Sequence, residues 1–129
     1  MPNLTDYNIL LDAPVELNFF GNNERTFNFN PPNDIQLDNN IDNRPVLSYR
    51  VDPSDETQNL QFNVFIRTNA GIDELVNSFT FNGTVSRTIF EATSSSHVDA
   101  GNNPIIFRLE DGIGSVTISD VIVWFKRSV

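Results

Sequence analysis

A short acidic segment, "DNNIDN", has the residue types and the spacing of a calcium-binding loop. Asp38, Asn40 and Asp42 occupy alternate positions, as the first oxygen ligands of such loops do. Asn43, however, stands where the turn of an EF-hand has glycine, and Tyr49 stands where the loop has a bidentate glutamate. The segment is therefore not an EF-hand. Two interpretations remain open, a weak calcium site and a solvated acidic turn.

A catalytic interpretation has two candidate groups of residues, and neither is complete. His97, the only histidine, lies two positions before Asp99 in "SSSHVDAGNN", but the sequence has no G-x-S-x-G nucleophile motif. One histidine is also too few for zinc catalysis through two or three imidazoles. Adjacent acids such as Asp55 and Glu56 do not supply the two carboxylates about 5 to 10 Å apart that glycoside hydrolysis uses. The sequence predicts a binding protein and not an enzyme.

Composition and charge exclude several classes of partner. The 129 residues include 8 basic and 17 acidic side chains, and the formal charge of −9 repels nucleic acids and anionic lipid surfaces. Cysteine is absent, which removes disulfides and thiolate metal sites but leaves the compartment undetermined. No apolar run is long enough for a signal peptide or a membrane span. We expect a soluble protein with no nucleic-acid partner and no membrane insertion, and its localisation stays unknown.

The elements that must position any site are predicted to be β-strands. Apolar and polar residues alternate in six segments, which is the pattern of strands with one buried face. These segments are 15–19, 27–29, 47–51, 60–66, 105–109 and 116–118. Turn-forming residues separate them, and only "GIDELVNS" tolerates a short helix. The prediction is an all-β, antiparallel two-sheet β-sandwich, jelly-roll-like, with residues 1–129 as a single domain.

The segment "FNGTV" allows two arrangements of the strands beside it. A hairpin with residues 82–84 in its loop would pair Phe81 with Val85 and place Phe79 on the same face as both. The same hairpin would set Arg87 opposite Phe79, which does not suit that face. In the alternative arrangement, the two strands belong to different sheets.

The last apolar segment, "SVTISDVIVWF", carries one acidic residue in its middle. Val116 and Ile118 alternate with polar residues, whereas every position in 121–125 is apolar. A β-bulge or a sheet crossover at Ser119 and Asp120 would explain this change of pattern. Asp120 would then bond backbone amides that the irregularity frees, or ligate a metal ion. The apolar run predicts a central strand, or a strand with one face covered by a partner.

The C-terminal part of the sequence resembles galactose-binding-like jelly-roll domains, a group that includes many carbohydrate-binding modules. The resemblance covers residues 46–127 and lies in "NNPIIFRLEDGIGSVTISDVIVWFKR", with "LQFNVFIRTN" and "RTIFEA" as the preceding strands. It implies a two-sheet sandwich, frequently with a structural calcium ion and with ligands at the loop ends. It also implies a calcium-binding carboxylate near the last strand, which suits Asp120, with Glu16 as a second ligand. The chain differs from sugar-binding members in lacking a tryptophan pair.

Two functions follow, and both are binding functions. The first is a carbohydrate-binding or lectin-like module, in which Asn and Asp side chains bind the hydroxyls of a saccharide, with calcium as the one cofactor considered. The second is a protein-interaction or self-assembly domain, in which an apolar face joins identical chains into a homo-oligomer or docks on a larger protein. Trp124 is predicted to be packed. The aromatic residues predicted to face solvent, a ligand or another chain are Tyr7, Phe20, Phe65 and Phe90.

Overall fold

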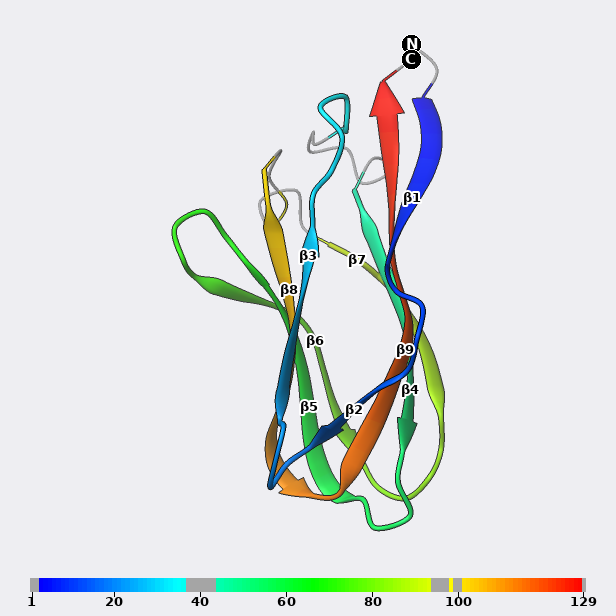
Figure 1. Ribbon diagram of the computed structural model, residues 1–129, viewed down its shortest axis with the longest axis vertical. Helices are drawn as coiled ribbons and strands as arrows, with labels where there is room; N and C mark the ends of the chain where they lie inside the picture. Colours follow the sequence, from blue (N-terminus) through cyan, green and yellow to red (C-terminus); the bar gives the residue numbers. More distant parts are fainter. Residues whose placement is uncertain (1–2, 37–43, 94–97, 99–100, 129) are drawn as a thin grey trace.

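The computed structural model describes residues 3–36, 44–93, 98 and 101–128. Within these ranges the chain forms nine β-strands (Figure 1). They are β1 (Asn3–Leu11), β2 (Val15–Asn18), β3 (Glu24–Phe29), β4 (Val46–Pro53), β5 (Gln58–Arg67), β6 (Asp73–Phe81), β7 (Arg87–Ala92), β8 (Asn103–Ile113) and β9 (Ser115–Ser128). No helix in the described ranges is long and apolar enough to cross a membrane.

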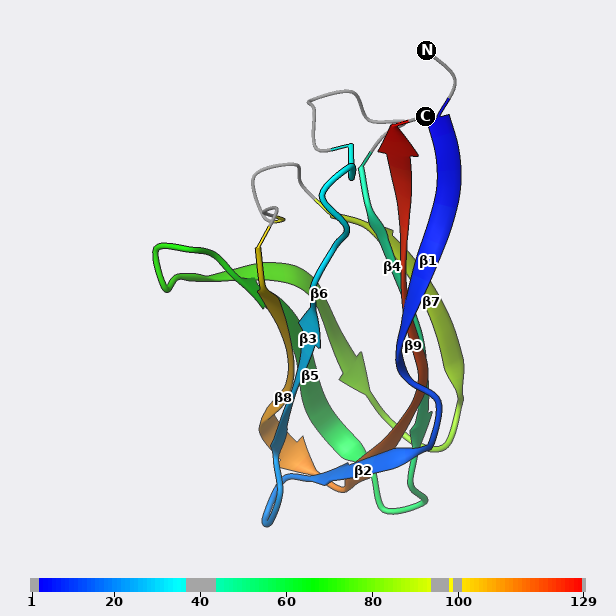
Figure 2. The same ribbon diagram turned by 45° about the horizontal axis from the view of Figure 1, so that its top comes forward.

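The strands form two antiparallel sheets that pack face to face. Sheet A has the order β1-β9-β4-β7, with β2 also paired to β9, and sheet B has the order β3-β8-β5-β6. In Figure 1 sheet A lies on the right and sheet B on the left, and Figure 2 shows β2 crossing the lower end of the sandwich. The start of β1 and the end of β9 lie together, since Asn3 pairs with Ser128. This architecture confirms the predicted jelly-roll sandwich.

Aromatic rings from both sheets meet in the core. The predicted inward residues of β4, β5 and β8 are all buried, namely Leu47, Tyr49, Val51, Leu60, Phe62, Val64, Ile66, Ile105, Phe107 and Leu109. The ring of Tyr49 in sheet A contacts the rings of Phe62 and Phe107 in sheet B, with centroids 6.1 and 5.0 Å apart. Such pairs each contribute about 0.5–1.5 kcal/mol beyond burial. Asn77 donates a hydrogen bond to the Tyr49 hydroxyl (3.3 Å), and burial raises the pKa of Tyr49.

The structure decides two local alternatives. The segment "GIDELVNS" forms no helix, because residues 73–78 lie in β6 and pair with β5 along the edge of sheet B. The hairpin with residues 82–84 in its loop is also wrong, because β6 pairs with β5 in sheet B while β7 pairs with β4 in sheet A. The alternative, with the two strands in different sheets, is the one observed. In this arrangement the Arg87 guanidinium lies over the ring of Phe81 at 5.9 Å and does not oppose Phe79.

A β-bulge interrupts β9 at the predicted position. Ser48 of β4 pairs with Ile122, and Arg50 pairs with Ser119, so β9 has one more residue than β4 between these pairs. Asp120 lies within the bulge and has a φ of 54°, in the left-handed region that few residues other than glycine, asparagine and aspartate adopt. β9 is a central strand of sheet A, between β1 and β4, as its apolar run indicated.

The bulge reverses which residues of β9 face the core. Before it the even-numbered Val116 and Ile118 are buried, and after it the odd-numbered Val121, Val123 and Phe125 are buried. Successive residues of a strand point to opposite faces. Ile122 and Trp124 therefore lie on the outer face of sheet A.

Candidate functional site

Three aromatic side chains from three strands lie on the outer face of sheet A. Tyr7 of β1 pairs with Trp124 of β9, and their ring centroids are 5.2 Å apart. Phe90 of β7 pairs with Ser48 of β4, which pairs in turn with Ile122 of β9. Tyr7 and Phe90 are 51% and 66% exposed, and Trp124 is half-buried. We refer to Tyr7, Phe90, Ile122 and Trp124 together as the Trp124 face.

Two hollows flank the indole of Trp124. The larger has a volume of about 210 Å³, and its lining includes Arg50, Thr88, Phe90, Asp120, Ile122 and Trp124. The smaller has a volume of about 110 Å³ and is lined by Thr5, Arg44, Val46, Trp124, Phe125 and Lys126. The indole Nε1 of Trp124 donates a hydrogen bond to the Ser48 hydroxyl at 2.9 Å, which fixes the orientation of the ring between the hollows.

Polar groups with fixed positions lie beside the larger hollow. The Arg50 Nε donates to both carboxylate oxygens of Asp52, at 3.1 Å each, and the Ser86 hydroxyl also donates to Asp52. These hydrogen bonds lower the pKa of Asp52, so its carboxylate is ionised at neutral pH and holds the guanidinium in place. Asp120 and Thr88 are exposed in the same hollow. Aromatic rings together with charged and hydroxyl groups suit a ligand that has both apolar faces and hydroxyls.

The carboxylate of Asp120 does not have the backbone role that the bulge suggested. No described residue donates a hydrogen bond to it, and its interaction is electrostatic, with the guanidinium of Arg50. The expected bond from Asp120 to backbone amides is therefore not seen. The bulge turns Asp120 toward the larger hollow, where its oxygens are open to solvent.

The predicted metal ligands fall into two groups. Asp38, Asn40 and Asp42 lie outside the described residues, as do His97 and Asp99. Glu16 and Asp120 are both exposed, and Glu16 pairs with Thr117 of β9. Among the described residues, no three acidic or histidine side chains come together as a metal-ion site. Calcium binding by Asp38, Asn40 and Asp42, or by Asp120 with Glu16, stays a prediction. Calorimetric titration with calcium would test it.

The four aromatic residues that were predicted to face solvent, a ligand or another chain have different surroundings. Tyr7 and Phe90 belong to the Trp124 face. Phe20 is 80% exposed in the turn after β2, beside the ring of Phe19. Phe65 of sheet B is half-buried, because the guanidinium of Arg108 lies 4.9 Å above its ring. The prediction that Trp124 is packed holds only in part, since its ring contacts that of Tyr7 but also lines two hollows.

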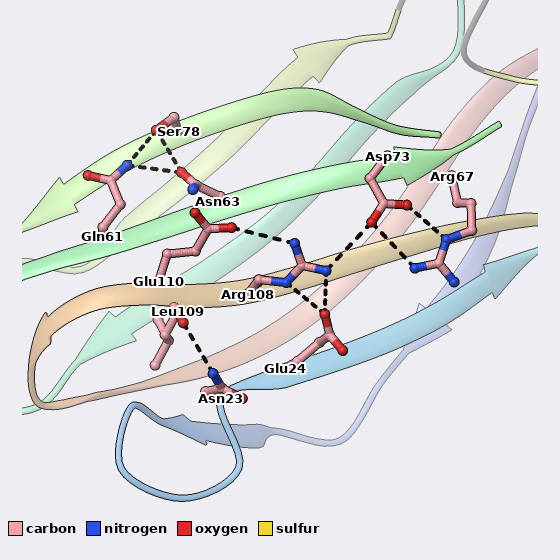
Figure 3. A network of polar contacts seen from close by, with 10 residues as sticks. All are labelled: Asn23, Glu24, Gln61, Asn63, Arg67, Asp73, Ser78, Arg108, Leu109 and Glu110. Atoms are coloured by element: carbon pink, nitrogen blue, oxygen red, sulfur yellow. Dashed lines mark hydrogen bonds and ion pairs between the residues drawn. The ribbon is translucent and has the colours of Figure 1, made fainter. Parts of the chain in front are cut away.

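The outer face of sheet B carries an ion-pair network (Figure 3). Arg108 of β8 lies at its centre and points toward three carboxylates (Figure 3). Its nitrogens are 2.6 Å from Glu24, 3.5 Å from Asp73 and 3.5 Å from Glu110. Arg67 of β5 also pairs with Asp73, at 2.8 Å. These charges satisfy one another, so this face has fewer free groups for a ligand than the Trp124 face.

Polar side chains of β5 and β6 continue this network along sheet B. The Gln61 amide donates to Asn63 at 2.9 Å and to the Ser78 hydroxyl at 2.6 Å, and Ser78 donates to Asn63 at 2.7 Å (Figure 3). Asn63 is buried, and an unpaired amide there would be costly. The three residues act as a structural cluster that joins β5 to its edge strand.

Stability is expected to fall in acid through Asp73. Its hydrogen bond from Arg67 lowers the pKa of Asp73 below its ordinary value of 3.8. A carboxyl with a lowered folded-state pKa stabilises the protein above the unfolded-state value, and this contribution is lost as the pH falls through the folded-state value. This carboxyl titrates between about pH 5 and about pH 3. Over that range, urea unfolding should show a steeper loss of the free energy of unfolding for the wild type than for Asp73→Asn.

A matched control for this experiment is Asp55→Asn, which changes an exposed turn carboxyl outside the network. It should keep the wild-type slope of unfolding free energy against pH. Solvent screening makes the effect of Asp73 small, because the pair is partly exposed. Equal slopes for all three proteins would show that the pair does not contribute.

Comparisons with known proteins place the fold among those of carbohydrate-binding modules. No protein-family model and no curated protein matches the sequence. A mutant of a family 29 carbohydrate-binding module matches with a TM-score of 0.54 and 10% identity, over 94% of this chain and 92% of that one. Xylanase10C from Cellvibrio japonicus, solved as a mutant with xylopentaose, matches with a TM-score of 0.53 and 12% identity, over 94% of this chain and 22% of that one.

A structure described as CBM4 has a TM-score of 0.49 and 18% identity, over 79% of this chain. The chain spans 61% of the length of that structure. At these identities the similarity is one of fold. The fold is the jelly-roll β-sandwich of carbohydrate-binding modules, which confirms the resemblance that the strand pattern indicated.

Proposed function

We propose that the protein is a non-catalytic carbohydrate-binding module whose ligand lies on the Trp124 face. The observation that carries the proposal is the set of partly exposed aromatic rings from three strands beside two hollows. Sugars bind proteins by stacking the apolar faces of their rings on aromatic side chains, while charged and amide groups take the hydroxyls. Structural neighbours described as carbohydrate-binding modules support this choice of ligand.

The dimensions of the face favour an oligosaccharide over a single sugar. Tyr7 and Phe90 belong to β1 and β7, the two strands at the ends of the order β1-β9-β4-β7. With neighbouring strands about 4.8 Å apart, the two rings are separated by about 14 Å across the sheet. Trp124 lies between them. A chain of several sugars lying across the strands would contact all three rings, with Arg50, Thr88 and Asp120 available to its hydroxyls in the larger hollow.

The second candidate function is self-association through the same face. Ile9 of β1, which pairs with Ile122 of β9, is 56% exposed, in addition to Tyr7 and Phe90. A second copy of the chain that covered these residues would bury apolar area without any saccharide. Both functions use the Trp124 face, so one substitution there affects saccharide binding and self-association alike. Measuring the saccharide affinity and the molecular mass of each variant separates the two functions.

Replacing Phe90 with alanine is expected to weaken saccharide binding, because Phe90 forms one wall of the larger hollow. A glycan array identifies binding oligosaccharides, and calorimetry then measures the affinity of the wild type and Phe90→Ala. Phe20→Ala is the control, since it removes an exposed ring that lies in the turn after β2 and lines neither hollow. It should bind as the wild type does. Self-association would be favoured instead if the array showed no saturable binding and the molecular mass rose with protein concentration in the wild type but not in Phe90→Ala.

A further inference from the structure

We infer that the smaller hollow beside Trp124 binds an anionic group of the saccharide, the carboxylate of a uronic acid. This inference rests on the proposed function, because the sugar ring itself would stack on Trp124. The hollow has a volume of about 110 Å³, its lining includes Arg44 and Lys126, and none of its lining residues in the described part of the chain is acidic. A cationic hollow of this kind is unexpected in a chain with 17 acidic and 8 basic residues.

Arg44 supplies the strongest reason for an anion. Its Nε is buried and has no hydrogen-bond partner among the described residues. A buried donor without a partner is costly, and native proteins pair most such donors with protein groups, water or an ion. The guanidinium fork matches a carboxylate and binds it through two parallel hydrogen bonds. Arg44 also lines the hollow, so a ligand carboxylate there would pair with its guanidinium, whose Nε contributes no hydrogen bond within the described protein.

Four other arginines already form ion pairs. Arg50 pairs with Asp52, Arg67 with Asp73, Arg108 with Glu24, and Arg127 with both Asp6 and Asp34. Neither Arg44 nor Lys126 forms an ion pair within the described part of the chain. Lys126 lies on β9 opposite Thr5 of β1, which adds a hydroxyl to the same hollow. The two cations are thus available to a ligand.

The two hollows differ in charge, and this difference sets the direction of the ligand. The larger hollow is lined by both Arg50 and Asp120, and Arg50 already pairs with Asp52, so the exposed Asp120 carboxylate leaves this hollow without a net positive charge for an anionic group. The smaller contains Arg44 and Lys126. Trp124 lies between them and offers a ring to the sugar on either side. A saccharide with one charged and one neutral residue would place the acid over Arg44 and the neutral ring beside Asp120.

Calorimetry with two oligosaccharides of equal length tests this inference. The probes are a β-1,4-linked glucose oligomer and a β-1,4-linked glucuronic acid oligomer, which differ in the oxidation of C6. We expect the wild type to bind the glucuronic acid oligomer about tenfold more tightly, the effect of one hydrogen-bonded charge. In Arg44→Gln the ratio of the two affinities should fall to about one, and in Lys126→Gln it should fall partly.

The control is Arg25→Gln, which makes the same change of charge on β3 of sheet B. It should keep the wild-type ratio, since charges beyond about 8 Å are largely screened at physiological salt. Circular dichroism and thermal unfolding establish that each variant is folded. Inorganic sulfate serves as a probe for a bare anion site.

The outcomes separate this inference from the proposed function. A wild-type ratio near one, with both oligomers bound, would overturn the inference and leave saccharide binding intact. An equal fall of the ratio in Arg25→Gln and Arg44→Gln would overturn it too, because general charge would then be the cause. If sulfate bound saturably and as tightly as the acidic oligomer, the hollow would be a site for a free anion and not for a uronic acid. Failure of both oligomers and all array glycans to bind would remove the proposed function itself.

Discussion

Replacement of Trp124 by alanine is expected to reduce saccharide affinity by roughly 100-fold, or about 2.7 kcal/mol. Among the described residues Trp124 alone lines both hollows, and its ring contacts that of Tyr7, with centroids 5.2 Å apart. A tryptophan buries roughly 150–250 Å² when a ligand covers it fully, at about 25 cal/mol per Å². Because most of the Trp124 side chain is already buried, at most about a third of this area remains for the ligand, and the lost stacking geometry supplies the rest of the effect.

Two further variants separate the role of the ring from that of its hydrogen bond. Trp124→Phe keeps an aromatic surface but removes the Nε1 donor to Ser48, so we expect an intermediate affinity. Thermal unfolding must show that Trp124→Ala still folds, since the residue is partly packed. Calorimetry with the best oligosaccharide from the array measures the affinities. Wild-type affinity in a folded Trp124→Ala would place the ligand on another surface.

Replacement of Gly112 by alanine is expected to lower the free energy of unfolding by about 3 kcal/mol or more. Gly112 has a φ of 102°, where side chains are strained, and a Cβ added to it would lie 2.6 Å from the Cα of Leu60. The backbone of β5 cannot move away without disturbing its pairing with β8. Since domains of this size have a total stability of about 5–15 kcal/mol, urea unfolding should detect the change clearly.

Two other glycines provide a graded comparison. Gly83 has a φ of 75° but no atom within 4 Å of an added Cβ, so Gly83→Ala tests backbone strain alone and should cost about 1 kcal/mol. Gly101 has neither a positive φ nor a close neighbour, and Gly101→Ala should be nearly neutral. Similar losses for Gly112→Ala and Gly83→Ala would mean that the close approach to β5 is relieved at little cost.

The core of the sandwich could be predicted from the sequence because burial follows a local rule. Inward residues such as Phe62, Val64 and Phe107 alternate with polar ones, and each is buried. β1 was not identified, because its residues do not alternate in this way. Its Tyr7 and Ile9 are exposed on the outer face of sheet A, so the strand is held by pairing with β9 and not by an apolar face alone.

The candidate site could be predicted only in part. Tyr7 and Phe90 were singled out as out of phase, and the structure exposes both on one face. Their meeting with Trp124 was not predictable, because the three residues belong to strands that are distant in sequence. The hydroxyl-binding loop residues that we expected are in part outside the described residues. The cationic pair Arg44 and Lys126 had no local signal, since neither has a regular spacing from the other.

The sequence by itself determined the class of fold, the inward residues of most strands and the position of an irregularity at Asp120, since each depends on the alternation of neighbouring side chains. The tertiary structure alone decided which strands pair and therefore which side chains share a face. One extra residue in β9 moved Trp124 to the outer face of sheet A. The physical reason is that hydrogen bonds between strands join segments at any distance along the chain, and pairing partners leave no trace in local periodicity.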